Sequence, residues 1–208
     1  MRYLESVVEF LQANPILLYN NNDDGRLNSA NSEEVLLDKI LKNFSNTQKP
    51  NIRSWYDFSI CEKEKIYVNI KISDLDNSAA DNCSSKLGMG YALTGVINMP
   101  ISWNTFHKML VKELKIGFDY YFLVINKNDT RDCFYTSLKR IKTLVPNGNN
   151  LPFQCDWSKN REFANRSEVE AMRYILDIYL QSWDKKVGIK RLRIILSSLK
   201  NYLQMTKF

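Results

Sequence analysis

Two neighbouring segments between residues 53 and 73 constrain the fold more strongly than any other feature of the sequence, because apolar and polar side chains alternate in both. The apolar positions are Tyr56, Phe58 and Ile60 in the first segment and Ile66, Val68, Ile70 and Ile72 in the second. Alternation with a period of two is typical of a β-strand that buries one face. The two segments therefore predict a β-hairpin whose apolar face belongs to the core.

The opposite face of this predicted hairpin carries polar side chains. When Ile60 pairs with Ile66 across the hairpin, Asp57 lies opposite Asn69. Lys71 shares the face of Asn69, because side chains two residues apart on a strand point the same way. A carboxylate, an amide and an ammonium group are therefore expected to converge on one face of the hairpin.

Helical periodicity recurs on both sides of the hairpin, at residues 4–11, 35–44, 103–114 and 169–183. The second of these helices is expected to be capped at its N-terminus by Asn31 or Ser32. A further helix is expected after Gly188, so that the chain would end in a helical pair.

Strands and loops are expected between these helices. The continuous apolar run at residues 119–127 is typical of a central strand buried on both faces. Residues 132–139 and 140–145 are expected to form two further short strands, and the polar residues 20–31 a loop. Together the elements predict an α/β fold in which helices flank a mixed central sheet.

Composition limits the classes of function that suit this chain. Its 208 residues suit a single domain over residues 1–208, and its net charge of +6 favours an anionic partner such as nucleic acid or an acidic surface. The four cysteines are widely spaced, which makes zinc unlikely and indicates a reducing cytoplasm. The single histidine, His107, is expected to be a surface or packing residue. No apolar run approaches 18 residues, so no membrane segment is expected.

The hairpin motif resembles that of the PD-(D/E)xK nucleases, in which an acidic residue on one strand is followed on the next by acid-x-Lys. Asp57 and the run Asn69-Ile70-Lys71 carry this resemblance, and the layout of the whole chain is similar to that of a small type II restriction endonuclease. Tyr56 replaces the proline of the motif, and Asn69 stands where Asp or Glu is usual. Either the chain is a natural Asn-x-Lys variant, or it carries an inactivating Asp-to-Asn change.

This resemblance implies a restriction-endonuclease-like core and a homodimer that hydrolyses double-stranded DNA at a short sequence with Mg²⁺. Asp57 would ligate the metal with help from Asn69 and the Ile70 carbonyl, while Lys71 would orient the attacking water. An amide oxygen can ligate a hard cation but brings no charge, so metal affinity is expected to be weaker than in an acidic site.

A glutamate on the helix before the hairpin is common in these nucleases. Glu33 and Glu34 both lie in the first turn of the predicted helix, where they also suit the helix dipole. Glu34 is the preferred candidate for the site. Two alternatives remain open: a DNA-binding protein of the same fold that does not cut, for which Asn69 is the argument, and a repair or junction-resolving nuclease.

Polar segments outside the hairpin are candidates for DNA contact. Residues 146–160 mix Asn and Gln, which can bond adenine, with basic residues that can bond guanine, although an ordinary loop would have a similar composition. The basic cluster at residues 185–193 is either a phosphate-binding surface or a solvated helix face. The candidate DNA-binding residues are Asn82, Lys86, Asn149, Asn150, Gln154, Lys159, Lys185 and Lys186.

Overall fold

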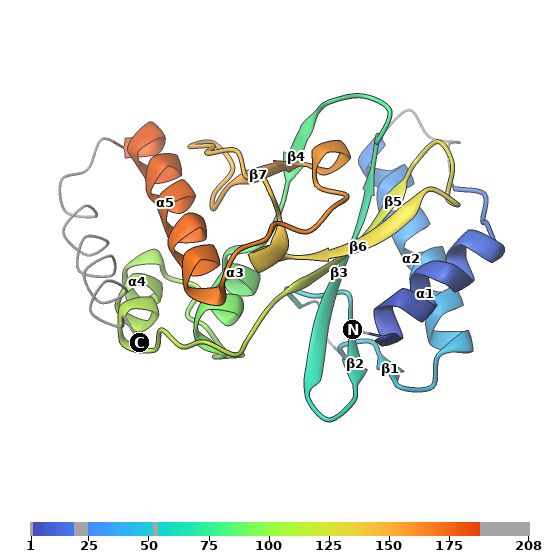
Figure 1. Cartoon of the computed structure of the whole chain (residues 1–208), viewed down its shortest axis with the longest axis horizontal. Helices are drawn as coiled ribbons and strands as arrows, with labels where there is room; N and C mark the ends of the chain where they lie inside the picture. The colour runs from blue at the N-terminus through green and yellow to red at the C-terminus, as the bar shows by residue number, and fades with distance from the viewer. Residues whose placement is uncertain (1, 19–24, 52–53, 188–208) are drawn as a thin grey trace. The chain divides into compact units, whose positions relative to one another are not determined.

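The computed structural model describes residues 2–18, 25–51 and 54–187 (Figure 1). The helices are α1 (Arg2–Ala13), α2 (Gly25–Asn43), α3 (Lys86–Thr94), α4 (Trp103–Lys112) and α5 (Glu168–Val187). The strands are β1 (Thr47–Gln48), β2 (Phe58–Cys61), β3 (Lys65–Ser73), β4 (Ala80–Asn82), β5 (Tyr121–Asn126), β6 (Cys133–Ser137) and β7 (Gln154–Asp156). The second helix of the predicted C-terminal pair lies outside the described residues.

The elements group into two compact units. The first contains Met1–Ala79 and Tyr121–Thr136, and the second contains Ala80–Tyr120 and Ser137–Phe208. None of the helices in the described ranges is both long enough and apolar enough to cross a membrane.

The five-stranded sheet of the first unit has the order β1-β2-β3-β5-β6. β1 and β3 both pair with β2 in antiparallel fashion, whereas β3 and β5 run parallel. The predicted α/β fold with a mixed sheet is therefore confirmed. The hairpin register is also confirmed, because Ile60 pairs with Ile66 and Phe58 with Val68.

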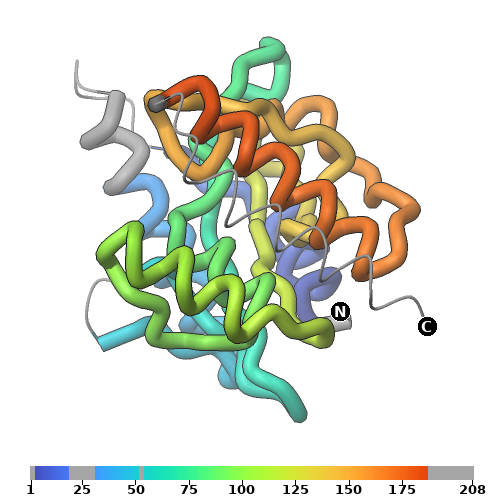
Figure 2. The backbone as a smooth tube through the Cα atoms, turned by 90° about the vertical axis from the view of Figure 1, so that its left-hand side faces the viewer, coloured from blue at the N-terminus to red at the C-terminus, as the bar shows by residue number. Residues whose placement is uncertain are grey.

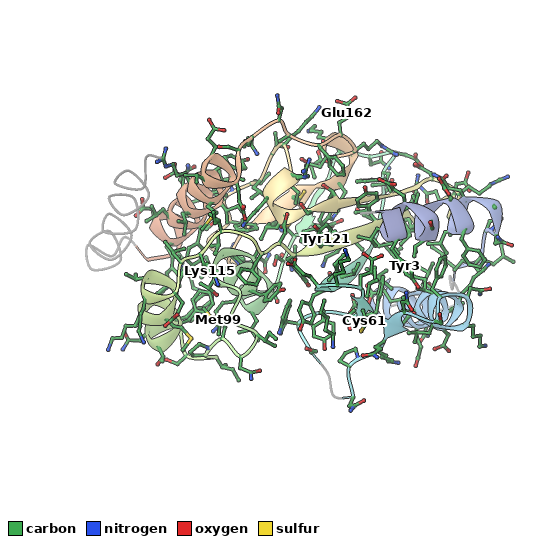
Figure 3. All side chains as sticks on the ribbon, turned by 60° about the horizontal axis from the view of Figure 1, so that its bottom comes forward. Tyr3, Cys61, Met99, Lys115, Tyr121 and Glu162 are labelled. Carbon is green, nitrogen blue, oxygen red and sulfur yellow. The ribbon has the colours of Figure 1, made fainter. Side chains whose placement is uncertain are left out.

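Helices α1 and α2 cover one face of this sheet (Figure 1). The core between them contains Leu4, Val7, Leu11, Leu36, Leu37, Ile40, Phe58, Ile60, Val68, Ile70, Leu123, Ile125 and Cys133. Tyr3 and Tyr121, which are labelled in Figure 3, add to this core from α1 and β5. The apolar face of the hairpin thus packs as its alternation predicts.

β5 is buried on both faces, as predicted for the apolar run at residues 119–127. Leu123 and Ile125 belong to the helix-covered core, while Phe122 and Val124 point to the opposite side of the strand and are equally buried. A strand enclosed in this way explains why its sequence shows no alternation.

Two predictions of local structure are wrong. α2 begins at Gly25, so part of the segment expected to be a loop is helical. The Asn and Ser residues there disfavour helix by only about 0.7 kcal/mol each or less, which a continuing helix can tolerate. Residues 140–145 do not form a strand: Ile141 and Leu144 are buried three positions apart, and only Val145 makes an isolated bridge, to Gln154.

The second unit contains α3, whose glycines allow aromatic rings to pack closely against it. Ser85 caps this helix by accepting a hydrogen bond from the Gly88 amide at 3.0 Å. A Cβ atom at Gly88 would lie 2.5 Å from the Tyr120 ring, and one at Gly90 would lie 2.8 Å from the Phe106 ring. The glycines of α3 therefore make room for aromatic side chains.

His107 is a buried packing residue between α4 and α5. Its Nε2 atom lies 2.7 Å from the hydroxyl of Tyr179, and its ring stacks on Trp103. Burial, together with the nearby charge of Lys86, lowers the pKa of His107 to about 4. The imidazole is therefore held mainly in its neutral form at physiological pH.

Candidate functional site

Asp57 is fixed at the start of the hairpin by hydrogen bonds to β3. Its backbone amide donates to the carbonyl oxygen of Val68 at 2.9 Å, which continues the register of the hairpin. Its Oδ2 atom accepts from Asn69 Nδ2 at 2.7 Å and from the Ile70 amide at 2.6 Å. Both of these side-chain contacts use Oδ2, and neither uses the other carboxylate oxygen, Oδ1.

The environment of Asp57 disfavours its negative charge. Burial raises the pKa of Asp57 above its ordinary value, and the Ile70 hydrogen bond and the positive charge of Lys71 oppose this effect. A carboxylate with a raised pKa gains free energy when a cation comes near it, because the cation stabilises the charged form.

Asn69 acts on Asp57 in a way that the motif alone does not predict. Its amide nitrogen donates a hydrogen bond to the Asp57 carboxylate and so helps to position that side chain. An aspartate at position 69 could not donate this hydrogen bond in its ionised form and would repel Asp57. The amide of Asn69 is therefore well suited to hydrogen-bond with Asp57, while the role of Asn69 as a metal ligand stays a prediction.

Glu33, and not the preferred Glu34, is the helix glutamate that acts on the hairpin site. The pKa of Glu33 is raised to about 7, first by burial and then by repulsion from Asp57, while Lys71 opposes the rise. Glu34 is exposed, and its Oε1 atom lies 3.8 Å from Lys49 Nζ. The preference for Glu34 is thus corrected.

The phase of the apolar stripe on α2 could have identified Glu33. The buried residues Leu36, Leu37 and Ile40 lie three, four and seven positions after Glu33, which places all four on one side of the helix. Glu34 is rotated by about 100° from that side, because an α-helix has 3.6 residues per turn.

Lys71 completes the group of charged side chains. It is half-buried on β3, and its positive charge acts on both Asp57 and Glu33. Asp57, Asn69 and Lys71 therefore lie near one another in the first unit, together with Glu33, while Glu34 of the same unit is exposed. We refer to Glu33, Asp57, Asn69 and Lys71 as the hairpin site.

An aromatic cluster lies next to the hairpin site. The ring centroids of Tyr56 and Tyr67 are 4.7 Å apart, and that of Trp55 lies 5.0 Å from Tyr67. The prediction that Tyr56 belongs to the core face is therefore wrong, because the alternation begins only at Phe58, where β2 begins. Trp55 and Tyr56 instead cover Tyr67 on the face that carries Asn69.

The donor set of the hairpin site suits a hard divalent cation. Within the described ranges no group of three or more His, Cys, Asp and Glu side chains is placed to hold a metal ion. Mg²⁺, however, commonly binds through one or two carboxylates together with waters and substrate phosphates. Asp57 and Glu33 supply two carboxylates, and burial is the main reason that the pKa of each is raised.

Several DNA-binding candidates gather in the second unit. Asn82 pairs directly with Gln154 across β4 and β7, and the segment before β7, which contains Asn149 and Asn150, contacts the end of α5 at Lys185. Asn82 lies at the end of the short strand β4.

Two of the candidate DNA-binding residues, Lys86 and Lys159, interact with other groups of the protein. The ammonium group of Lys86 donates to the Ile101 carbonyl oxygen and lies 4.4 Å from the centroid of the Trp103 ring, and burial lowers its pKa. Lys159 Nζ lies 2.9 Å from a carboxylate oxygen of Asp156. Both lysines therefore interact within the protein.

The aromatic residues of the segment 146–160 also serve the core. Phe153 and Trp157 are 1% and 0% exposed, so neither ring can stack on a base in this conformation.

A scan against protein-family models finds no matching family, and a search of curated proteins finds no significant match. The hairpin site and the polar surfaces are therefore the features of this chain that bear on its function.

Proposed function

We propose that this chain is a Mg²⁺-dependent type II restriction endonuclease, which hydrolyses phosphodiester bonds at a specific sequence in double-stranded DNA and works as a homodimer. The observation that carries the proposal is the arrangement around Asp57. One of its oxygens is held by Asn69 and Ile70, the charge of Lys71 acts on it, and its own charge raises the pKa of Glu33.

Glu33 supplies the second negative charge that the motif lacks at position 69. Asp57 and Glu33 are the residues that would hold Mg²⁺ near the scissile phosphate, and Asn69 would orient Asp57 for this task. Bound there, Mg²⁺ would neutralise the phosphate and lower the pKa of a bound water. The proposed metal ligands thus include two carboxylates, as the chemistry of Mg²⁺ favours.

Lys71 is assigned to the attacking water and to the negative charge that develops on the phosphate. Hydrolysis forms a bond between the water oxygen and phosphorus and breaks the bond to the leaving ribose oxygen. An ammonium group beside Asp57 can orient the water and stabilise the added charge without changing its own protonation. The half-buried position of Lys71 strengthens this interaction because solvent screens it less.

A DNA-binding protein that does not cut is the second candidate, and Asn69 is the observation that favours it. The hairpin site would then be a relic of an enzyme whose second acid was lost. The contact between Asn69 and Asp57 argues against a recent loss, since the amide makes a hydrogen bond that an aspartate would not make.

Incubation of the protein with phage DNA and Mg²⁺ tests the proposal. Discrete fragments support a sequence-specific endonuclease, and Glu33→Ala should abolish them while Glu34→Ala, its matched control on the same helix, should not. Binding of duplex DNA without cleavage, under all metal conditions, would favour the protein that does not cut. Cleavage of four-way junctions but not of linear duplexes would favour a junction-resolving nuclease.

A further inference from the structure

Amide side chains from separate segments of the second unit meet around Gln154. Asn82 on β4 lies directly opposite Gln154 on β7, so the two side chains share a face of this small sheet. Asn147 Nδ2 donates to Gln154 Oε1 at 2.6 Å. The Val145 and Gln154 backbones exchange hydrogen bonds of 2.7 and 2.8 Å, which hold the segment before β7 against that strand.

Asn147 also fixes the turn that follows it. Its Oδ1 atom accepts from the backbone amides of Asn149 at 2.8 Å and Asn150 at 3.1 Å. Such a side chain–backbone turn sets the local backbone without a regular element. Asn147 therefore bonds inside the protein, while Asn149 and Asn150 stand exposed at the end of a defined turn.

The same turn is attached to the C-terminal end of α5 (Figure 2). The Asn147 amide donates to Ser182 Oγ at 3.0 Å, and Lys185 Nζ donates to the Pro146 carbonyl oxygen at 2.9 Å. A Cβ atom at Gly148 would lie 2.7 Å from the backbone nitrogen of Lys186, so only glycine allows this approach. The exposed amides and the exposed Lys186 are thus carried by one rigid arrangement.

We call this arrangement the amide surface, and it consists of Asn82, Asn147, Asn149, Asn150, Gln154, Lys185 and Lys186. A primary amide presents a donor and an acceptor side by side, which matches the N6 and N7 atoms of adenine in the major groove of duplex DNA. A neighbouring ammonium group can contact a phosphate. Phosphate contacts do not depend on the base sequence, so we expect the amides to supply more of the discrimination between sequences than the lysines.

We infer that the amide surface recognises an adenine-containing sequence in duplex DNA, with Asn149 and Asn150 in contact with base edges and Asn147 as the residue that positions them. This inference rests on the proposed function for its partner, since it names what would direct the enzyme to its target. It uses residues of the second unit, so binding can be measured apart from hydrolysis at Asp57.

The test is selection from a fluorescent pool of random duplexes by the full chain carrying Lys71→Ala, which removes the proposed cleavage. This parent should enrich a motif that contains adenine. On the same background, Asn149→Ala with Asn150→Ala should weaken binding to that motif by about 5-fold to 150-fold, the range that a lost base contact gives. Binding to random duplex should change by less than about 2-fold.

Asn147 and a matched control separate positioning from general damage. Asn147→Ala should lose motif binding as the double variant does, and Asn147→Asp should recover part of it, because its carboxylate still accepts from the two backbone amides but cannot donate to Gln154. Asn165→Ala, at an exposed amide of the same unit outside the amide surface, should bind like the parent. Near-ultraviolet circular dichroism should be the same for all of these variants.

The inference is overturned if the parent enriches no motif, if the double variant keeps the motif, or if binding to motif and random duplex falls equally. Failure of the proposed function gives a different result. In that case the wild-type chain would cut no DNA with Mg²⁺, while the parent would still enrich a motif that depends on Asn149 and Asn150.

Discussion

Replacing Glu33 with glutamine should make the metal-free protein more stable at high pH. The Glu33 carboxyl has a pKa of about 7 in the folded protein, against an ordinary value of 4.5. Below pH 4.5 the carboxyl is protonated in both the folded and the unfolded state, and its contribution to the free energy of unfolding is fully present. Between 4.5 and 7 the folded state keeps a proton that the unfolded state releases, so stability falls as pH rises, and above 7 the loss is complete.

The size of this effect follows from the difference between the two pKa values. At about 1.4 kcal/mol per pH unit, the upper bound is about 3 kcal/mol. Because Glu33 is only partly buried, solvent screening reduces the expected effect to ~1–2 kcal/mol. Glu33→Gln removes the ionisation, so it should be more stable than the wild type by this amount at pH 8 and nearly equal to it at pH 4.5.

Urea unfolding in EDTA at pH 4.5, 6, 7 and 8 would measure the difference, and Glu34→Gln is the matched control because that carboxyl is exposed and pairs with Lys49. Asp57, whose pKa is also raised, titrates in both proteins and largely cancels in the comparison. Saturating Mg²⁺ should stabilise the wild type at pH 8 more than Glu33→Gln. Equal stabilities of the wild type and Glu33→Gln at pH 8, or the same gain for Glu34→Gln, would refute the reasoning.

Further outcomes follow from the same sites. EDTA should abolish cleavage and Mg²⁺ or Mn²⁺ should restore it, because the hairpin site offers only oxygen ligands; activity in EDTA would contradict this. Lys71→Ala should lower single-turnover cleavage at least 10²-fold while DNA affinity changes less than about tenfold, and an equal loss of both would move Lys71 to the DNA-contact surface. Asn69→Asp should leave cleavage or alter its metal preference in a natural variant, and should create activity in an inactivated one. Gly148→Ala should lower the free energy of unfolding by about 1–3 kcal/mol, since its Cβ would overlap the Lys186 backbone; unchanged stability in urea would mean that the loop can move away.

The hairpin was predictable because its pattern is local. Strict alternation specifies both the strands and the buried face, and a one-residue slip would expose Ile60 and Val68, so the register was fixed as well. Asp57 and Asn69 came together in consequence. Tyr56 was misplaced because periodicity does not say where the strand begins.

The second unit shows what local patterns cannot supply. β4 and β7 have three residues each, too few to display a period, and they pair across more than 70 residues of sequence. The neighbourhood of Asn82, Gln154 and Asn147 exists only because of that pairing. The sequence identified Asn82 and Gln154 as separate candidates and did not single out Asn147, and tertiary packing brought the three together.

The position of Glu33 changes the interpretation of Asn69, which stands where the motif has an acidic residue. Judged by the hairpin alone, an amide at this position removes one negative charge from the proposed metal site. On α2, however, a glutamate in phase with the buried stripe restores a second carboxylate near Asp57, and repulsion from Asp57 contributes to its raised pKa. A third carboxylate at position 69 would increase that repulsion while Lys71 remained the one cation acting on Glu33 and Asp57 in the described part of the chain. Asn69 and Glu33 are therefore best understood together. The neutral amide of Asn69 donates a hydrogen bond to Asp57, and Glu33 on α2 provides the second carboxylate that the motif would have at position 69.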